Sequence, residues 1–348
     1  MKACTVKPGA LDTAGVEDIA EPSADDGSVL VEGLYVGICG TDLEVAREGY
    51  GRPPEGHERI VLFHESLGRV LEAPADSGLA AGDLVAGVVR RPDPEPCVAC
   101  AADRWDFCRN GGFTERGIAG RDGYGAQRWR VDPKFAIRLD PSLGRLGVLL
   151  EPTSVVAKAW DQVGRIAARS PGEARVALVT GAGPIGLLAA MIGRQRGLKV
   201  NVLDRVTEGP KPGMVAELGA RYLTSLDDLT EPPDVVIEAT GIGSLVFDVL
   251  GRAAPDAVVC LTGISAGARE IPLAADAINK ALVLSNEVVF GSVNAGLGDY
   301  AAAAAALASA DPDWLAKLIS RTVPMKDWPG ALERQPGDIK VVVDLQAD

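Results

Sequence analysis

The sequence predicts an α/β protein of two domains, in which a small irregular β-barrel is followed by a doubly wound parallel sheet. The chain has 348 residues, which suits two domains better than one. Its first part is rich in glycine, proline and short β-prone runs, whereas strands and helices alternate from about residue 158 onward. A glycine-rich turn joins the first strand and the first helix of this second part.

Short apolar runs separated by turn residues predict the strands of the barrel. The opening residues form one such run, and others cover residues 29–34, 60–63 and 84–89. This pattern of short strands and many turns is typical of a small irregular barrel.

The second part consists of continuous apolar runs, the kind of sequence that forms buried parallel strands. Such runs cover residues 175–180, 199–203, 234–239, 257–261 and 287–291. An alanine-rich helix is expected over residues 299–308 and a closing strand over residues 341–343. Alternating strands and helices predict a doubly wound parallel sheet.

The turn after the first of these strands reads Gly181-Ala182-Gly183-Pro184-Ile185-Gly186 and opens a helix. The first glycine permits a tight turn, the second lets the backbone approach a pyrophosphate, and the third allows close packing of the helix. The N-terminus of this helix offers amide donors and a partial positive charge to a phosphate. The sequence therefore predicts a dinucleotide site, and the residues assigned to it are Gly181, Gly183, Pro184, Ile185, Gly186, Asp204, Arg205 and Thr240.

Asp204, at the end of the second strand of this part, bears on the choice between NAD and NADP. Its carboxylate is placed to accept hydrogen bonds from the adenosine ribose, and it would repel a 2'-phosphate. Arg205 has the opposite effect, since a neighbouring arginine can bind that phosphate. On balance the carboxylate predicts that NAD is preferred over NADP.

Three kinds of potential metal ligand come from distant segments of the first part. Cys39, His64 and Glu151 offer a thiolate, an imidazole and a carboxylate, which suit a catalytic zinc site with an open fourth position. Thr41 can relay the proton of an alcohol whose pKa the metal lowers. Together with a dinucleotide, such a site predicts hydride transfer. His57 lies in a polar segment whereas His64 ends an apolar run, so we expect His64 to be the ligand.

Three further cysteines form a second cluster, in which Cys97 and Cys100 are followed by Cys108. A structural zinc site normally has four ligands, so the fourth is missing here or is supplied by Asp93, Glu95 or Asp103. A second zinc site and a lobe with free thiols are both compatible with this spacing.

The acidic composition of the chain excludes some classes of binding partner. The net charge is -13 with a pI near 4.8, which argues against nucleic acid or an anionic membrane as a partner. The opening residues lack the apolar run of a signal peptide. We therefore expect a cytoplasmic protein with reduced cysteines that acts on a small molecule.

These motifs resemble those of the zinc-containing medium-chain dehydrogenase/reductase superfamily. Residues 39–42 and 64–70 match its zinc motifs, although Phe63 stands where glycine is usual. Residues 112–118, Glu151-Pro152 and residues 291–294 resemble more specifically the archaeal-type glucose 1-dehydrogenase subgroup. The resemblance implies a GroES-like catalytic domain over residues 1–157, completed by residues 295–348, and a Rossmann domain over residues 158–294.

The resemblance also implies roles for single residues. Glu115 would bind sugar hydroxyls, and Asn294 would lie near nicotinamide and substrate. Glu151 would contact the substrate as well as the metal, and Glu65 would be able to approach the metal. A homodimer or homotetramer is expected on the same ground.

Two departures from the family pattern concern the metal lobe and the substrate. Pro94 occupies the position of the first ligand of the lobe, and residues 153–157 lack the acidic side chains that the subgroup carries after Glu151-Pro152. We predict a zinc-dependent NAD(P) oxidoreductase acting on a sugar, a polyol or a related secondary alcohol. The alternatives are a dehydrogenase of an aminosugar or cyclitol, and a catalytically silent relative that binds a dinucleotide.

Overall fold

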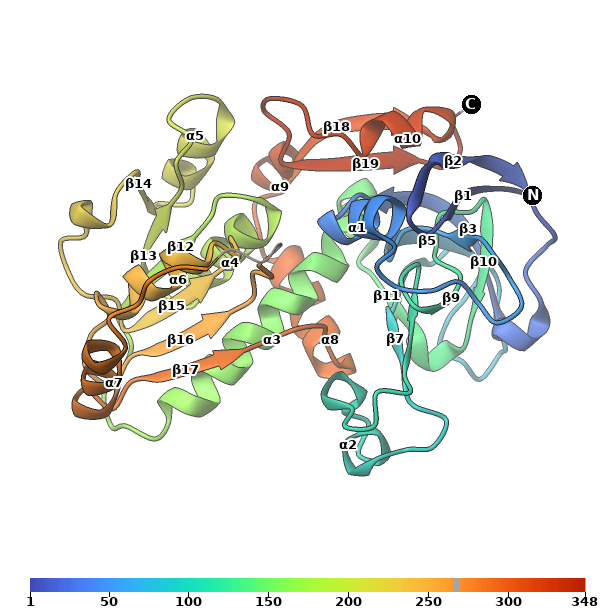
Figure 1. Ribbon diagram of the computed structural model, residues 1–348. Helices are drawn as coiled ribbons and strands as arrows, with labels where there is room; N and C mark the ends of the chain where they lie inside the picture. Colours follow the sequence, from blue (N-terminus) through green and yellow to red (C-terminus); the bar gives the residue numbers. More distant parts are fainter. Residues whose placement is uncertain (266–269, 348) are drawn as a thin grey trace. The chain divides into compact units, whose positions relative to one another are not determined.

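The computed structural model describes residues 1–265 and 270–347, and the chain divides into two compact units (Figure 1). The first unit comprises Met1–Ser154 together with Asn294–Asp348, and the second comprises Val155–Val293. The chain thus leaves the first unit once and returns to it for its last segment.

The first unit is a barrel-like assembly of mostly antiparallel sheets. The largest sheet has the order β11-β6-β5-β3-β19-β18, and β10 also pairs with β3. Its strands are β3 (Val29–Gly37), β5 (Glu65–Glu72), β6 (Leu84–Gly87), β10 (Arg128–Val131), β11 (Ala136–Arg138), β18 (Ile319–Pro324) and β19 (Lys340–Asp344). Two smaller sheets contain β1 (Lys2–Lys7), β2 (Ala10–Asp18) and β4 (Ile60–Val61), and β7 (Arg90–Arg91), β8 (Thr114–Arg116) and β9 (Gly120–Arg121).

The C-terminal strand completes this barrel. Strand β19 pairs antiparallel with β3, with Asp344 opposite Tyr35 and Val342 opposite Gly37. The ring of Trp328 packs edge-on against that of Phe63 at 5.4 Å, and both side chains are fully buried. The return of the chain therefore brings residues near position 340 against the end of β3. The helices of this unit are α1 (Gly40–Glu48), α2 (Val98–Ala101), α8 (Leu297–Ala308), α9 (Pro312–Leu318) and α10 (Trp328–Ala331).

The second unit is a six-stranded, fully parallel sheet with the order β14-β13-β12-β15-β16-β17. Its strands are β12 (Val176–Thr180), β13 (Lys199–Leu203), β14 (Arg221–Leu223), β15 (Val235–Glu238), β16 (Val258–Leu261) and β17 (Val288–Gly291). Its helices are α4 (Pro184–Gln195), α5 (Pro210–Glu217), α6 (Gly243–Leu250) and α7 (Ala275–Leu284), and α3 (Leu150–Ala167) leads into it. The central strands β12 and β15 are buried along their whole length, which explains their continuous apolar sequence.

The predicted fold class is confirmed, and each apolar run that predicted a strand contains one. The run at residues 60–63 forms a strand only at Ile60–Val61, because Phe63 adopts a left-handed backbone conformation with φ 73° and ends the extended segment. Strand β18 was not predicted; it lies at the edge of the sheet and pairs in parallel with β19. Among residues 1–265 and 270–347 no helix has the length and apolar character needed to cross a membrane.

Candidate active site

Three potential metal ligands converge in the first unit. The ligand atoms of Cys39, His64 and Glu65 all lie within 4.8 Å of one another, and the last two residues are buried. The pairing of β3 with β5 places Gly37 opposite Glu65. Cys39 follows the end of β3 and His64 precedes the start of β5, so this pairing brings the thiol and the imidazole together.

Two backbone features shape this cluster. A side chain at Gly37 would place its Cβ 2.0 Å from the Oε2 atom of Glu65, so only glycine leaves room for that carboxylate. Phe63 has φ 73°, a conformation that costs energy for a bulky residue and is favourable for glycine. The position where the family usually has glycine is therefore one where the backbone makes a left-handed turn just before His64.

Asp42 contacts both the backbone of Cys39 and the imidazole of His64. It is fully buried, and its Oδ2 accepts a hydrogen bond from the backbone N–H of Cys39 at 2.7 Å. Its Oδ1 lies 3.5 Å from Nδ1 of His64, which directs the other ring nitrogen away from Asp42. Burial disfavours the charged imidazole, but the Asp42 carboxylate and the Cys39 sulfur outweigh it and raise the pKa of His64.

A buried ion pair with Lys340 borders the cluster and was missed by sequence reasoning. The Nζ atom of Lys340 lies 2.6 and 2.7 Å from the two carboxylate oxygens of Glu65 and also donates to the carbonyl of Ile38 at 3.1 Å. Both side chains are 2% exposed. Burial opposes the charge of the lysine, but Glu65 and Cys39 raise the pKa of Lys340. Glu65 is therefore a carboxylate whose charge is already balanced.

Glu151 is a second acid beside this cluster. It lies in the first turn of α3, is 8% exposed, and does not belong to the group of three ligand atoms within 4.8 Å. Burial raises the pKa of Glu151 to about 7; His64 lowers it and Glu65 raises it, so the three groups interact electrostatically. The hydroxyl of Thr41 lies 4.0 Å from the sulfur of Cys39.

Glu115, predicted to bind substrate, is held by two partners in the same unit. Its Oε1 accepts hydrogen bonds from Nε of Arg90 at 3.0 Å and from Nδ2 of Asn294 at 2.9 Å. The Arg90 guanidinium stacks on the ring of Phe113 at 3.8 Å, which fixes its plane. The structure places Glu115 and Asn294 in contact with each other, and Arg90, which was not predicted, also binds Glu115. These contacts all engage Oε1, and Oε2 makes no hydrogen bond within residues 1–265 and 270–347.

The glycine-rich turn of the second unit has the geometry that its sequence predicts. Gly181 has φ 89°, and a Cβ on Gly186 would lie 1.8 Å from the carbonyl oxygen of Gly181. A Cβ on Gly183 would meet no atom within 4 Å, so the space above that residue is open. Pro184 is the first residue of α4, where its missing N–H costs nothing, and Ile185 follows it.

Asp204 anchors the end of β13. Its Oδ2 accepts a hydrogen bond from the N–H of Ala182 at 2.7 Å and pairs with Nζ of Lys211 at 3.1 Å, while Oδ1 accepts from Val206 N–H at 3.0 Å. Burial opposes ionisation, but these backbone and lysine donors lower the pKa of Asp204. The carboxylate is therefore ionised and has a cation beside it that sequence reasoning missed. Arg205 is exposed.

The three cysteines of the second cluster also converge. Their sulfur atoms lie within 4.8 Å of one another, with 3.7 Å between Cys97 and Cys100. The N–H of Arg109 donates to the Cys97 sulfur at 3.3 Å, and this and other backbone hydrogen bonds lower the pKa of Cys97 to about 6. Of the three acids considered as a fourth ligand, Asp93 is 8% exposed and its Oδ2 lies 4.0 Å from the sulfur of Cys108.

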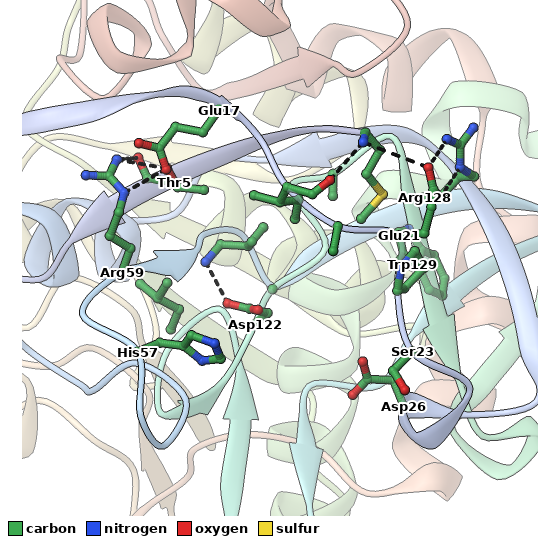
Figure 2. Close-up of a pocket in the computed structure, with 18 of the residues that line it drawn as sticks. Thr5, Glu17, Glu21, Ser23, Asp26, His57, Arg59, Asp122, Arg128 and Trp129 are labelled. Carbon is green, nitrogen blue, oxygen red and sulfur yellow. Dashed lines mark hydrogen bonds and ion pairs between the residues drawn. The ribbon is translucent and has the colours of Figure 1, made fainter.

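A separate cavity of about 530 Å³ lies in the first unit beside the β1–β2 hairpin (Figure 2). None of the predicted site residues lines it, whereas His57 does, so the competing imidazole lies at this cavity and not at the metal cluster. Charged side chains that line the cavity pair with one another, as Arg59 does with Glu17 at 2.8 Å.

The chain is similar to known dehydrogenases over its whole length. Residues 25–141 match the alcohol dehydrogenase GroES-like domain, and residues 144–345 match the glucose dehydrogenase C-terminus. The chain is 36% identical to a glucose 1-dehydrogenase of Methanocella arvoryzae, with all of both chains covered. It is also 36% identical to a glucose 1-dehydrogenase of Thermoproteus tenax, with 99% of this chain and 100% of the relative covered.

A solved structure shares the fold of both units. Haloferax mediterranei glucose dehydrogenase, in complex with NADP, Zn and gluconolactone, matches with a TM-score of 0.91 and 30% identity, and 100% of each chain is covered. The fold, the converging ligands and these similarities lead to one conclusion: the chain belongs to the glucose 1-dehydrogenase family of zinc-containing medium-chain dehydrogenases.

Proposed function

We propose that this chain oxidises glucose or a closely related sugar, with a zinc ion and NAD(P) as its cofactors. The observation that carries the proposal is the convergence of a thiol, a buried imidazole and buried carboxylates beside Asp42, a donor set that suits Zn²⁺. The Haloferax mediterranei relative, solved with NADP, Zn and gluconolactone, supports the same cofactors and substrate class.

Cys39, His64 and Glu151 would hold the zinc ion. Glu65 is nearer to the thiol and imidazole, but Lys340 balances its charge. Glu151 is buried and interacts electrostatically with His64. A bound zinc ion acts as a Lewis acid that lowers the pKa of a substrate hydroxyl. Glu151 would therefore be the third ligand, and Glu65 would balance the charge of Lys340 beside it.

Other residues of the chain would bind the sugar and carry the proton. Glu115 is fixed through Oε1 by Arg90 and Asn294, which leaves Oε2 to accept a hydrogen bond from a sugar hydroxyl. Thr41 presents a hydroxyl next to the thiol and can pass a proton from the substrate towards solvent. Asn294 donates to Glu115 and would therefore lie beside the bound sugar.

The substrate range depends on what replaces the acidic residues of the subgroup. Thr153 and Ser154 are fully buried, and their hydroxyls donate to the carbonyls of Leu149 and Glu151, both at 2.6 Å. Both hydroxyl groups donate to nearby backbone carbonyls and so do not point to a sugar. Sugar recognition would rest on Glu115, Asn294 and Glu151, fewer acceptors than the subgroup carries, so an aminosugar or cyclitol stays the alternative substrate.

The dinucleotide would bind at the glycine-rich turn, with the amides at the start of α4 facing its pyrophosphate. Gly181, Gly183, Pro184, Ile185, Gly186 and Thr240 form this part of the proposed site. Asp204 favours NAD, but Lys211 and Arg205 offer cations to a 2'-phosphate, and the Haloferax relative contains NADP. We propose that the cofactor preference is set by the balance between Asp204 and these two cations.

A turnover screen tests the proposal. Zinc-loaded protein is assayed with aldoses, polyols and aminocyclitols, each with NAD and with NADP, while dinucleotide binding is measured separately. Glucose or a close aldose should give the highest kcat/KM, and Glu115→Gln should raise KM for it. Higher kcat/KM for an aminocyclitol would replace glucose by the alternative. Dinucleotide and zinc binding without any turnover would identify a catalytically silent relative.

The cysteine lobe would hold a second zinc ion with Asp93 as its fourth ligand. The three sulfurs lie within 4.8 Å of one another, and Oδ2 of Asp93 lies 4.0 Å from the sulfur of Cys108. Backbone hydrogen bonds lower the pKa of Cys97 to about 6, which favours its thiolate at neutral pH. Gly112 N–H donates to Oδ2 of Asp93 at 3.0 Å, which orients that oxygen.

We also expect a cytoplasmic homodimer or homotetramer. Light scattering would test the oligomeric state.

A further inference from the structure

Glu238 is a buried carboxylate that neither the sequence motifs nor the proposed chemistry uses. It is the last residue of β15 and is fully buried. Within residues 1–265 and 270–347 no lysine or arginine lies within ion-pair distance of it. Burying a carboxylate is costly unless hydrogen bonds replace its water, so its partners indicate what it does.

The partners of Glu238 are donors on two neighbouring strand ends. Its Oε1 accepts from the Thr180 hydroxyl at 3.1 Å and from the N–H groups of Thr240 and Gly241 at 2.7 and 3.2 Å. The Thr240 hydroxyl donates to the same oxygen, and Gly241 N–H also reaches Oε2 at 3.2 Å. One carboxylate thus ties the end of β12 to the turn that follows β15.

These two strands flank the point where the order of the sheet reverses. Thr180 and Glu238 face each other in register, and from them the chain proceeds through β13 and β14 on one side and through β16 and β17 on the other. In open parallel sheets, ligands bind outside the carboxyl ends of the strands at such a switch point. Glu238 therefore lies at the switch point of the sheet, where the dinucleotide is expected.

Three turns pack around this carboxylate. A Cβ on Gly181 would lie 3.0 Å from the Thr240 methyl group, so the turn held by Glu238 touches the glycine-rich turn. A Cβ on Gly263 would lie 2.7 Å from Oε2 of Glu238 and 2.2 Å from the nitrogen of Gly241. The third turn is also bonded to Glu238, because Thr262 N–H donates to its carbonyl at 2.8 Å.

We propose that Glu238 is a positioning residue for the dinucleotide, an inference that rests on the proposed use of NAD(P). Its carboxylate holds Thr240 and the Gly241 peptide in place before the ligand arrives, so that binding costs less ordering of these turns. A carboxylate suits this role because it can accept from all four donors at once, whereas a glutamine amide would turn a donor towards some of them.

The test compares Glu238→Gln with Asp234→Asn in the zinc-loaded protein. Asp234 is a matched control, because its Oδ2 accepts from the N–H groups of Arg175 and Val176 at 2.8 and 2.9 Å, at the opposite end of the same two strands. Dissociation constants for NAD(H) and NADP(H) are measured by fluorescence titration, with Tm and zinc content alongside. Glu238→Gln should weaken dinucleotide binding by about tenfold, while kcat at saturating cofactor stays near wild type. Asp234→Asn should lower Tm and leave the dissociation constants unchanged.

A second variant keeps the test decisive if Glu238→Gln folds poorly. Thr240→Val removes the hydroxyl that Glu238 binds and should weaken dinucleotide binding in the same way, and the double variant should lose no more than the larger single loss. Wild-type affinity in both single variants, or equal behaviour of Glu238→Gln and Asp234→Asn, would overturn the inference. Wild-type protein that binds no dinucleotide would instead refute the proposed function.

Discussion

In the metal cluster of the first unit every candidate ligand atom belongs to a side chain, whereas at the glycine-rich turn of the second unit backbone amides face the expected ligand. The cluster draws on three segments that are far apart in sequence and meet through sheet pairing, and they contribute Cys39, the adjacent pair His64 and Glu65, and Lys340. The turn is one contiguous segment whose shape follows from glycines at set positions.

This difference predicts how each region responds to substitution. A side-chain cluster loses a ligand or a charge when one residue changes, so single substitutions should have large and specific effects. A backbone site keeps its donors when most side chains change, and side chains there should adjust affinity or preference.

The largest effect is expected at the cluster itself. Cys39→Ser and His64→Ala each remove a metal ligand and should lower kcat/KM by about 10³-fold, because loss of the Lewis acid costs several kcal/mol of transition-state stabilisation. Zinc analysis should show the loss of one zinc ion, while the dinucleotide dissociation constant stays at its wild-type value.

His57→Ala is the matched control for that experiment. His57 is exposed and lines the cavity beside the β1–β2 hairpin, so its removal should leave turnover and zinc content unchanged. Damage equal to that of His64→Ala would show that the wrong histidine has been assigned to the metal.

A smaller effect is expected from Lys340, the only charge partner of Glu65 among the described residues. Lys340→Met leaves a buried carboxylate without compensation and free to coordinate the metal. Turnover should fall by about 10–100-fold, the range found when groups that support metal ligands are removed. Zinc should resist a chelator more strongly than in the wild type. Lys340→Arg should restore most activity, and faster zinc loss from Lys340→Met would contradict the role given to this pair.

The same contrast explains what the sequence could and could not predict. The sheet of the second unit and its glycine turn follow from local patterns, since apolar runs and glycine spacing lie within short segments. No local sequence pattern identifies the charged partners Arg90, Lys211, Glu238 and Lys340. A charged residue is expected at the surface, and its buried partner becomes apparent only in the folded structure. At Phe63 the sequence showed only that the glycine usual in the family is replaced, and the left-handed backbone at this position became apparent in the structure.

At the dinucleotide site one side chain should shift preference without abolishing binding. Asp204→Gly removes the repulsion of a 2'-phosphate and releases Lys211 to bind it. The ratio of NAD to NADP efficiency should fall by about tenfold, which corresponds to about 1.4 kcal/mol. Lys211→Met should move the ratio in the opposite direction. An unchanged ratio in Asp204→Gly would remove Asp204 from the determinants of cofactor choice.

The smallest effect on turnover is expected at the cysteine lobe, where side chains offer the metal ligands and backbone N–H groups donate to them. Asp93→Asn weakens the proposed fourth ligand but leaves the three thiols, so zinc content should fall from two ions to one per chain and Tm should drop. Glucose turnover should stay near wild type, because none of the residues proposed for catalysis belongs to the lobe. Glu95→Gln is the control, since only the backbone N–H of Glu95 contacts Asp93. Two zinc ions in Asp93→Asn would show that another group completes the site. A single zinc ion in the wild type that is lost in Cys39→Ser would show that the lobe folds around free thiols.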